Sequence, residues 1–354
     1  MKRIQKQILC LLLGLFCLSM NCAAKSSKTF TVFQLNLWGA GSIVPNGYQG
    51  IIDVLSEVNA DVAFLCEIHG NKTVSTIVDD LEKRGIYYYG EAFELNVGIL
   101  SKIKPDSIIA CCTVPDNEIR TLLKAVININ GQPVSFYSAH LDHQNYGCYL
   151  PRGYNGANWS KAKHPVTDEK EVLKANRLSF RYESIRLFLQ HVQADLQQGI
   201  PVVLGGDFNE PSYLDWQKNT RNLRDHNGAV INWDCSVLLH KAGFIDTFRK
   251  KYPNPVRVPG ITYPAGNKWA KLKQLTWAPD ADERDRIDFI YYSPGNSKIS
   301  LKNSMLVGPS ETVAYNEIVE TPFDDYIFTP QCVWPSDHKG NLAIFKIRRP
   351  LSND

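Results

Sequence analysis

The chain has 354 residues, of which 44% are hydrophobic and 21% are charged, and this composition excludes a disordered or fibrous protein. The formal net charge of +3 arises from Lys2, Arg3 and Lys6, because residues 1–24 contain no acid and the remainder has 36 basic against 36 acidic residues. A neutral remainder argues against a bulk electrostatic grip on nucleic acid, although it leaves room for a local basic patch.

The first 24 residues have the pattern of an export signal. A basic start is followed by an apolar stretch over 8–18, which is too short to span a bilayer as a helix, and by the small-residue region Cys22-Ala23-Ala24. We expect a signal peptide over 1–24 and an exported chain over 25–354, located in the periplasm, outside the cell or on its outer surface. The alternative is a lipoprotein anchored at Cys22, although Asn21 is not the small residue that such sites prefer.

Six cysteines follow residue 24. An exported location permits disulfides, but their spacing assigns no pairing. The absence of a CxxC motif from the sequence argues against a zinc site.

The first half of the exported chain predicts strands alternating with helices. Residues 29–37 alternate as a strand, 48–58 have helical spacing, and 61–68 form an apolar run typical of a strand buried on both faces. A helix over 73–84 follows. Further strands are predicted over 87–92, 96–101, 107–113, 122–129 and 134–140, with a hairpin turn at Asn130-Gly131 between the last two.

The second half contains two stretches without a clear period, 141–170 and 213–233, which predict long surface loops. Between them, 173–197 predicts a single amphipathic helix on which Arg181 faces solvent. A helix over 236–242 is predicted next. Strands over 275–277, 287–292, 298–307 and 342–347 complete what we expect to be one α/β domain.

The stretch 201–212 ends a short apolar run in two glycines, followed by Asp207 and Asn209. In an extended chain, residues two apart point the same way, so both side chains can reach one point in space. A carboxylate and an amide there would suit a hard divalent cation or a phosphate. The alternative for this stretch alone is a turn that closes a strand.

Polar side chains gather at six places that each adjoin a predicted strand. Turns explain one such place easily but not six, and a shared metal and anion site would satisfy all these groups together. The residues are Asn36, Glu67, His140, Asp207 with Asn209, Asp288, and Asp337 with His338.

These segments, in this order, resemble the endonuclease/exonuclease/phosphatase superfamily over about residues 29–348. The resemblance implies a four-layer α/β-sandwich, with two packed, mostly antiparallel sheets flanked by helices, as in deoxyribonuclease I. The segments are Leu35-Asn36-Leu37-Trp38, Leu65-Cys66-Glu67-Ile68, Ser138-Ala139-His140-Leu141-Asp142, Gly205-Gly206-Asp207-Phe208-Asn209, Asp285-Arg286-Ile287-Asp288-Phe289-Ile290 and Ser336-Asp337-His338.

The resemblance also implies a metal site. Glu67 would be the main ligand of a divalent ion, with Asn36 beside it and Asp337 completing the metal or phosphate shell. The expected ion is Mg²⁺, with Mn²⁺ or Ca²⁺ as alternatives, because carboxylate and amide oxygens suit hard cations. The number of metal ions, one or two, is left open.

The same resemblance implies the catalytic roles. Asp207 and Asn209 would position the attacking water and the phosphate, and Asp288 would orient His338. His140 would donate a hydrogen bond to the phosphate or to the leaving oxygen. Whether His338 or Asp207 takes the proton of the water is left open.

The function implied is an exported, metal-dependent phosphoester hydrolase that acts on a phosphodiester or a phosphomonoester. Lipid headgroups and small phosphoesters are preferred over nucleic acid as substrates, because the exported chain is formally neutral. The alternatives are a non-specific endonuclease or exonuclease on DNA or RNA, and a non-catalytic phosphate-binding protein. No stable protein partner is implied, and we expect a monomer. The aromatic and basic residues of 141–170 would either contact the substrate or pack among themselves.

Overall fold

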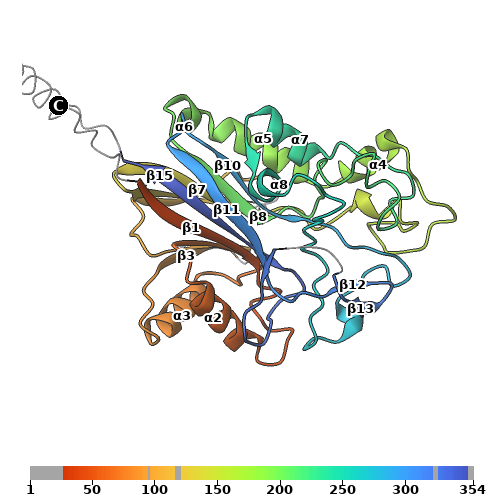
Figure 1. The fold of residues 1–354 in the computed structure, drawn as a ribbon, viewed down its shortest axis with the longest axis horizontal. Coiled ribbons are helices and arrows are strands. Elements are labelled where there is room, and N and C mark those ends of the chain that lie inside the picture. The colour runs from red at the N-terminus through yellow and green to blue at the C-terminus, as the bar shows by residue number, and fades with distance from the viewer. Residues whose placement is uncertain (1–26, 95, 116–120, 322–325, 350–354) are drawn as a thin grey trace, which may run out of the picture.

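The computed structural model describes residues 27–94, 96–115, 121–321 and 326–349 (Figure 1). The expected signal peptide and the anchor candidate Cys22 lie outside the described residues. Within the described residues, no helix is long and apolar enough to cross a membrane. None of the six cysteines after residue 24 forms a disulfide.

The larger sheet has seven strands and contains both ends of the described chain. Its neighbours are antiparallel except for the parallel pairs β1–β2 and β11–β14. The order is β14 (Ile327–Phe328), β11 (Ile299–Val307), β15 (Gly340–Arg348), β1 (Ser27–Asn36), β2 (Val62–Cys66), β4 (Val97–Ser101) and β3 (Tyr89–Phe93).

The second sheet has six strands, of which only the neighbours β7 and β8 run parallel. Its order is β5 (Ser107–Cys111), β6 (Leu122–Ile129), β7 (Gln132–His140), β8 (Val202–Asp207), β10 (Asp288–Ser293) and β9 (Ile245–Asp246). A separate two-stranded sheet pairs β12 (Thr312–Ala314) with β13 (Glu317–Val319).

Helices cover the outer faces of the two sheets (Figure 1). The helices α2 (Gly47–Val58) and α3 (Asn71–Glu82) lie below the strands in this view. The opposite side carries α4 (Glu169–Asn176), α5 (Arg181–His191), α6 (Gln193–Gln197), α7 (Asp234–Lys241) and α8 (Thr247–Lys251). Among the described residues, two 3₁₀ turns occur, at Gly147–Tyr149 and Leu272–Gln274.

Three apolar clusters correspond to the three interfaces of this four-layer arrangement. Phe64 and Phe136 meet between the sheets. Ile51 belongs to the cluster between the larger sheet and its helices, and Phe188 to the cluster between the second sheet and its helices. Burial on both faces explains why the strand at 62–66 is apolar at every position. The predicted four-layer α/β-sandwich is confirmed.

The prediction of one continuous helix over 173–197 is wrong, because the structure has α4, α5 and α6 there. The chain leaves the helix after Asn176, and Leu178, inside the predicted helix, is 71% exposed. The break allows the Phe180 amide to donate to the carboxylate of Asp142 (3.0 Å) and Arg181 to enter the protein. Tertiary contacts therefore interrupt the helix between α4 and α5, and the helical period starts anew at α5.

Two other predictions need correction. The strand expected over 275–277 is absent, because this segment follows a 3₁₀ turn and binds the carboxylate of Glu283 through the Trp277 amide. The stretches 141–170 and 213–233 are largely irregular, as predicted, but they pack on each other. Tyr149 from the first and Trp216 and Trp233 from the second belong to one buried cluster.

Candidate active site

The fold brings the six polar places together because they all lie at one edge of the sheets. Asn36 and Glu67 are at the carboxyl ends of the parallel strands β1 and β2, where Asn36 pairs with Cys66. His140 pairs with Asp207 at the ends of the parallel strands β7 and β8. The carboxyl ends of parallel neighbours meet at the same edge, so side chains that follow them become neighbours.

The antiparallel strands complete this edge with residues from their amino ends. Asp288, the first residue of β10, pairs with Asp207. Asp337 and His338 lie just before β15, with only Lys339 between His338 and the strand. Gly206 permits the close approach of β7 and β8, because a Cβ there would lie 1.7 Å from the carbonyl oxygen of Ala139.

His338 and Asp288 form a buried imidazole–carboxylate pair. His338 Nδ1 lies 2.9 Å from Asp288 Oδ2, and Gln34 donates to the other oxygen of Asp288 at 2.9 Å. Burial alone would lower the pKa of His338, but the neighbouring carboxylates, Asp288 first, raise it well above its usual range. The imidazole is therefore held in one orientation with Nε2 facing the pocket.

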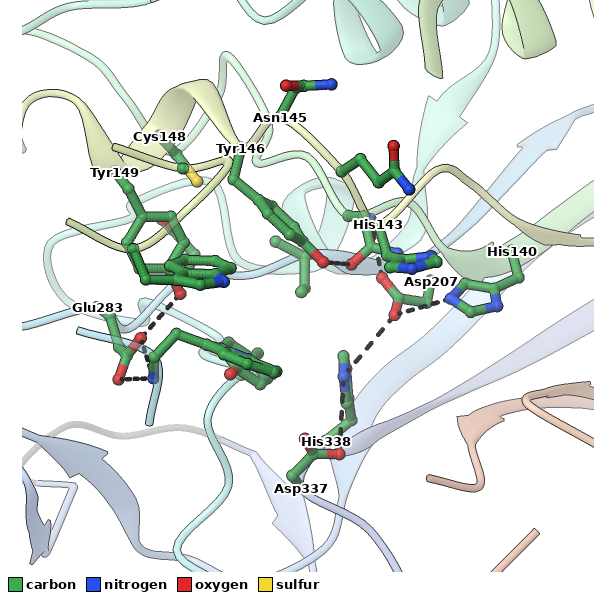
Figure 2. Close-up of a pocket in the computed structure, with 18 of the residues that line it drawn as sticks. His140, His143, Asn145, Tyr146, Cys148, Tyr149, Asp207, Glu283, Asp337 and His338 are labelled. Atoms are coloured by element: carbon green, nitrogen blue, oxygen red, sulfur yellow. Dashed lines mark hydrogen bonds and ion pairs between the residues drawn. The ribbon is translucent and has the colours of Figure 1, made fainter. Parts of the chain in front are cut away.

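Asp207 lies between the two histidines (Figure 2). Its Oδ2 atom is 3.7 Å from His338 Nε2 and 3.8 Å from His140 Nε2. Burial raises the pKa of Asp207 to about 7, although the charge of His338 opposes this rise. A carboxyl whose pKa lies near neutrality can both accept and release a proton under ordinary conditions.

Asn36 joins two carboxylates of the site. Its Nδ2 donates to Glu67 Oε1 (3.1 Å) and to Asp207 Oδ2 (3.0 Å). Glu67 Oε2 accepts from the Gly39 amide at 2.8 Å. Burial raises the pKa of Glu67, but His140 and the hydrogen bonds outweigh this effect and lower the pKa overall.

Both the nitrogen and the oxygen of the Asn209 side-chain amide are hydrogen-bonded within the protein. Its Nδ2 donates to the carbonyl of Leu141 (3.0 Å), and its Oδ1 accepts from the Tyr146 hydroxyl (2.7 Å). The backbone amide of Asn209 donates to Asp207 Oδ1 at 2.8 Å, which forms a turn in which Asn209 has a φ of 50°. Stretch 201–212 is thus both a strand-closing turn and part of the site, and Asp207 and Asn209 do not follow simple strand alternation.

His140, Tyr146, Asp207, Asn209, Glu67 and His338 line one pocket of about 630 Å³, whereas Gln34, Asn36 and Asp288 lie behind its wall. Asp337 also lines it, and burial raises the pKa of this carboxyl to about 7. Figure 2 shows His140, Asp207, Asp337 and His338 at one side of the pocket and Tyr149 and Glu283 at the other.

Sequence comparison identifies the family at this point. The profile of the Endonuclease/Exonuclease/phosphatase family matches residues 33–338. The chain belongs to this family. It is 29% identical over 294 residues to an uncharacterized protein, F14F9.5, of Caenorhabditis elegans, and the match covers 79% of this chain and 85% of that protein.

Solved structures share the fold. TDP2 of D. rerio, complexed with a single-strand DNA product, has a TM-score of 0.52 and 17% identity, with 90% of this chain and 99% of that chain covered. An endonuclease/exonuclease/phosphatase of Beutenbergia cavernae has a TM-score of 0.51 and 15% identity, with 91% and 72% covered. At such identities the likeness shows the fold alone.

The donor atoms of the site fit a divalent cation. One donor atom from each of Asp207, Asp288 and His338 lies within 4.8 Å of the other two, and His338 and Asp288 are also bonded to each other. Within the described chain, Asp337 Oδ1 is buried and accepts no hydrogen bond, and His338 Nε2 lies 3.8 Å from it. A buried carboxylate oxygen without a donor is costly, and a cation bound there would remove the cost. Glu67 adds a second charged donor to this side of the pocket.

Three residues of the site, Gln34, Asn96 and Tyr263, were not among the predicted ones, and Tyr146 was expected only as one of the aromatic residues of 141–170 that could contact the substrate. Asn96 bonds His140 Nδ1, Gln34 bonds Asp288, and Tyr146 bonds Asn209. Tyr263 lines the pocket with its ring centroid 5.0 Å from that of His338. Gln34 alternates with Asn36 on β1 and could have been found from this spacing, whereas the others come from loops that only tertiary structure places.

Arg181 was predicted to face solvent, and this prediction is wrong. Its side chain is fully buried, and its guanidinium donates to the carbonyls of Asp142 (2.7 Å) and Asn145 (2.8 Å). It also lies over the Tyr146 ring at 5.4 Å. Arg181 therefore fixes the loop that carries Tyr146, and through it Asn209. Helical periodicity could not reveal this, because the helix begins only at Arg181.

Proposed function

We propose that this family member is an exported, divalent-metal-dependent hydrolase of phosphodiesters. The observation that carries the proposal is the single pocket in which the His338–Asp288 pair, Asp207 and His140 face the carboxylates of Glu67 and Asp337. Residues of this kind provide proton transfer, hydrogen bonds to a phosphate and a cation site within one cavity.

In the proposed reaction, a water oxygen forms a bond to phosphorus as the bond to the leaving alcohol breaks. Asp207 takes the proton of the water, because its pKa of about 7 suits a general base. His338 and His140 donate hydrogen bonds to the phosphate, and the leaving alkoxide takes a proton from solvent. A divalent cation held by Glu67, Asn36 and Asp337 would neutralise the charge that develops on the phosphate oxygens.

The test uses the purified chain with Mg²⁺ and bis(p-nitrophenyl) phosphate. We expect hydrolysis that a chelator stops and that added Mg²⁺ restores. His338→Ala and Glu67→Ala should each lower kcat by about 10²-fold or more, because they remove a hydrogen-bond donor and a cation ligand. Their circular dichroism should match wild type. Near wild-type turnover in either variant would show that the site is assigned wrongly.

A nuclease is the second candidate. It is favoured by the fold shared with D. rerio TDP2, whose structure holds a single-strand DNA product. Cleavage of single-stranded DNA at a kcat/KM above that for small phosphodiesters would favour this candidate. Metal-dependent binding of phosphate without turnover on any substrate would instead indicate a non-catalytic binding protein.

The proposed export rests on the N-terminal pattern of residues 1–24. Expression in a bacterium and analysis of the mature N-terminus would test it. Cleavage after residue 24 supports a signal peptide, and an acylated N-terminus at Cys22 supports a lipoprotein. An intact N-terminus retained in the cytoplasm would refute both.

A further inference from the structure

The pocket extends well beyond the groups that would act on a phosphate. Its volume of about 630 Å³ is in the range of small-molecule sites. Figure 2 shows that Tyr149 and Glu283 lie across the pocket from Asp207 and His338. This far end is therefore available for the part of the substrate that carries the phosphate.

Aromatic rings form much of the far end. Trp159 and Trp277 stack with centroids 5.0 Å apart and an angle of 20° between their planes. Tyr149 meets Trp159 edge-on at 4.8 Å. Tyr149 and Trp159 come from one segment and Trp277 from another that is distant in sequence, and all three rings line this space. Ring faces attract organic cations through their quadrupole.

Glu283 places a negative charge beside these rings. Its carboxylate accepts hydrogen bonds from the Tyr149 hydroxyl (2.8 Å), the Trp277 amide (3.1 Å) and the Ala278 amide (3.2 Å), and also from the Thr276 hydroxyl. Burial raises the pKa of Glu283, and these four donors oppose the rise. With its lone pairs occupied, the carboxylate can attract a ligand by its charge but offers little as a hydrogen-bond acceptor.

The carboxylate of Asp285, which also lines the pocket, likewise has both oxygens occupied by donors. It pairs with the Arg152 guanidinium at 2.8 Å and accepts from Trp216 Nε1 at 2.9 Å. Among the described residues that line the pocket there is no lysine or arginine. A second phosphate on the substrate would therefore meet carboxylates and rings instead of a cationic partner.

We propose that the far end of the pocket binds a quaternary ammonium group, and that the substrate is a phosphodiester carrying such a group. The inference rests on the proposed hydrolase function for its catalytic half. A quaternary ammonium has no N–H donor, so it needs charge and ring faces but no free acceptor, which is what Glu283 and the aromatic rings provide. A nucleobase would need hydrogen-bond partners for its edge, and both carboxylates here are already occupied.

The experiment compares two substrates that differ only in charge. One is p-nitrophenyl phosphorylcholine, and the other is its neutral analogue, 3,3-dimethylbutyl p-nitrophenyl phosphate. With Mg²⁺ and the wild-type chain, we expect kcat/KM to be about tenfold or more higher for the choline ester, as for a cation–π site partly removed from water. Bis(p-nitrophenyl) phosphate reports on the hydrolase site independently of the ammonium.

Two variants connect the preference to the far end. In Trp277→Ala and Glu283→Gln, the ratio of kcat/KM for the choline ester to that for the neutral ester should fall toward one. Trp269→Ala is the matched control, because Trp269 is 38% exposed and lines a different pocket. This control should keep the wild-type ratio.

A binding measurement tests the ammonium site separately from the proposed hydrolase function. Choline and 3,3-dimethylbutanol are titrated into the wild-type chain while tryptophan fluorescence is followed, and choline should bind about tenfold more tightly. Equal binding and equal kcat/KM for the charged and neutral compounds would overturn the ammonium site while leaving the hydrolase intact. A preference for p-nitrophenyl thymidine 5′-phosphate over the choline ester would overturn it in favour of base stacking. Tight choline binding without hydrolysis of any ester would support the ammonium site and refute the hydrolase.

Discussion

Tyr263 is the residue of the site whose role follows most directly from its surroundings. Its side chain is only 7% exposed, yet within the described chain its buried hydroxyl has no hydrogen-bond partner. Leaving a buried hydroxyl without a partner costs about 1–3 kcal/mol. The orientation of Tyr263 toward the pocket suggests that a ligand supplies the missing partner, and a phosphoester oxygen is the acceptor expected there.

Replacement of Tyr263 by phenylalanine should therefore impair catalysis and spare the fold. We expect kcat for bis(p-nitrophenyl) phosphate to fall by about 10²-fold, the effect of losing one donor to a developing oxyanion. The free energy of unfolding should be unchanged or slightly higher, because the unsatisfied hydroxyl is gone. Tyr315→Phe, which removes an exposed hydroxyl bonded to Asp225, is the control and should keep wild-type kcat. A kcat of Tyr263→Phe within twofold of wild type would contradict this role.

The segment that links α4 to α5 depends on one buried cation. Arg181 begins α5 and donates to backbone carbonyls of the loop after β7, while its Nε lies 3.9 Å from the buried carboxylate of Glu210. The carboxylate of Glu210 also binds the Cys235 amide at the start of α7. The guanidinium of Arg181 therefore connects α5 to the loop after β7 and, through the carboxylate of Glu210, to the start of α7.

Truncation of this residue tests that dependence. Arg181→Ala should lower the free energy of unfolding by about 3–5 kcal/mol, because it leaves Glu210 and several carbonyls buried without their partner. Urea denaturation measures the change. Arg186→Ala on the same helix removes only an exposed pair with Glu183 and should cost less than about 1 kcal/mol. Equal losses in the two variants would refute the structural role of Arg181.

At the scale of the whole molecule, stability should depend on pH through His226. Burial first, and then the charges of Arg152 and Arg224, lower the pKa of His226 well below its usual range. The ring stacks on Trp216 with centroids 3.6 Å apart. Below a pH of about 6.5, the unfolded chain takes up a proton that the native His226 does not, so native stability falls as the pH falls.

His226→Phe keeps an aromatic ring against Trp216 but removes the titrating group. Between pH 7 and pH 5, the wild type should lose about 2 kcal/mol more of its unfolding free energy than the variant does. Urea denaturation at the two pH values measures both losses. Losses that are the same in the two proteins would show that His226 is not the responsible group.

A bound cation should also stabilise the molecule as a whole. The carboxylates of Glu67, Asp207 and Asp337 lie in one pocket and repel one another, and burial raises the pKa of the last two to about 7. A cation that binds only the native state stabilises it by about 2.7 kcal/mol at a concentration 100-fold above Kd. Mg²⁺ should therefore raise Tm by several degrees, and a chelator should reverse this. In Glu67→Ala, Mg²⁺ should no longer raise Tm, whereas in Glu82→Ala, on α3, it should still do so. A wild-type Tm that does not change with Mg²⁺ would contradict the cation site.

The strand and helix positions could be predicted from the sequence because their causes are local. An apolar run such as 62–66 can only be buried, and the spacing of apolar residues in 48–58 selects one helical face. The order of polar motifs along the chain was enough to indicate the family and its four layers. Residues such as Glu67, Asp207 and His338 were identifiable because each lies at or within two residues of a strand end.

Only the tertiary structure decided which loops meet at the site. Tyr146, Tyr263 and Glu283 lie on irregular segments, where no period links a residue to its direction. Arg181 was misplaced because the predicted helix is interrupted before it and α5 begins at this residue. The strand-end residues come together because parallel and antiparallel pairing brings their ends to one edge, which follows from topology. The aromatic far end of the pocket depends instead on contacts between residues more than one hundred positions apart, such as Tyr149 and Glu283, and those contacts exist only in the folded chain.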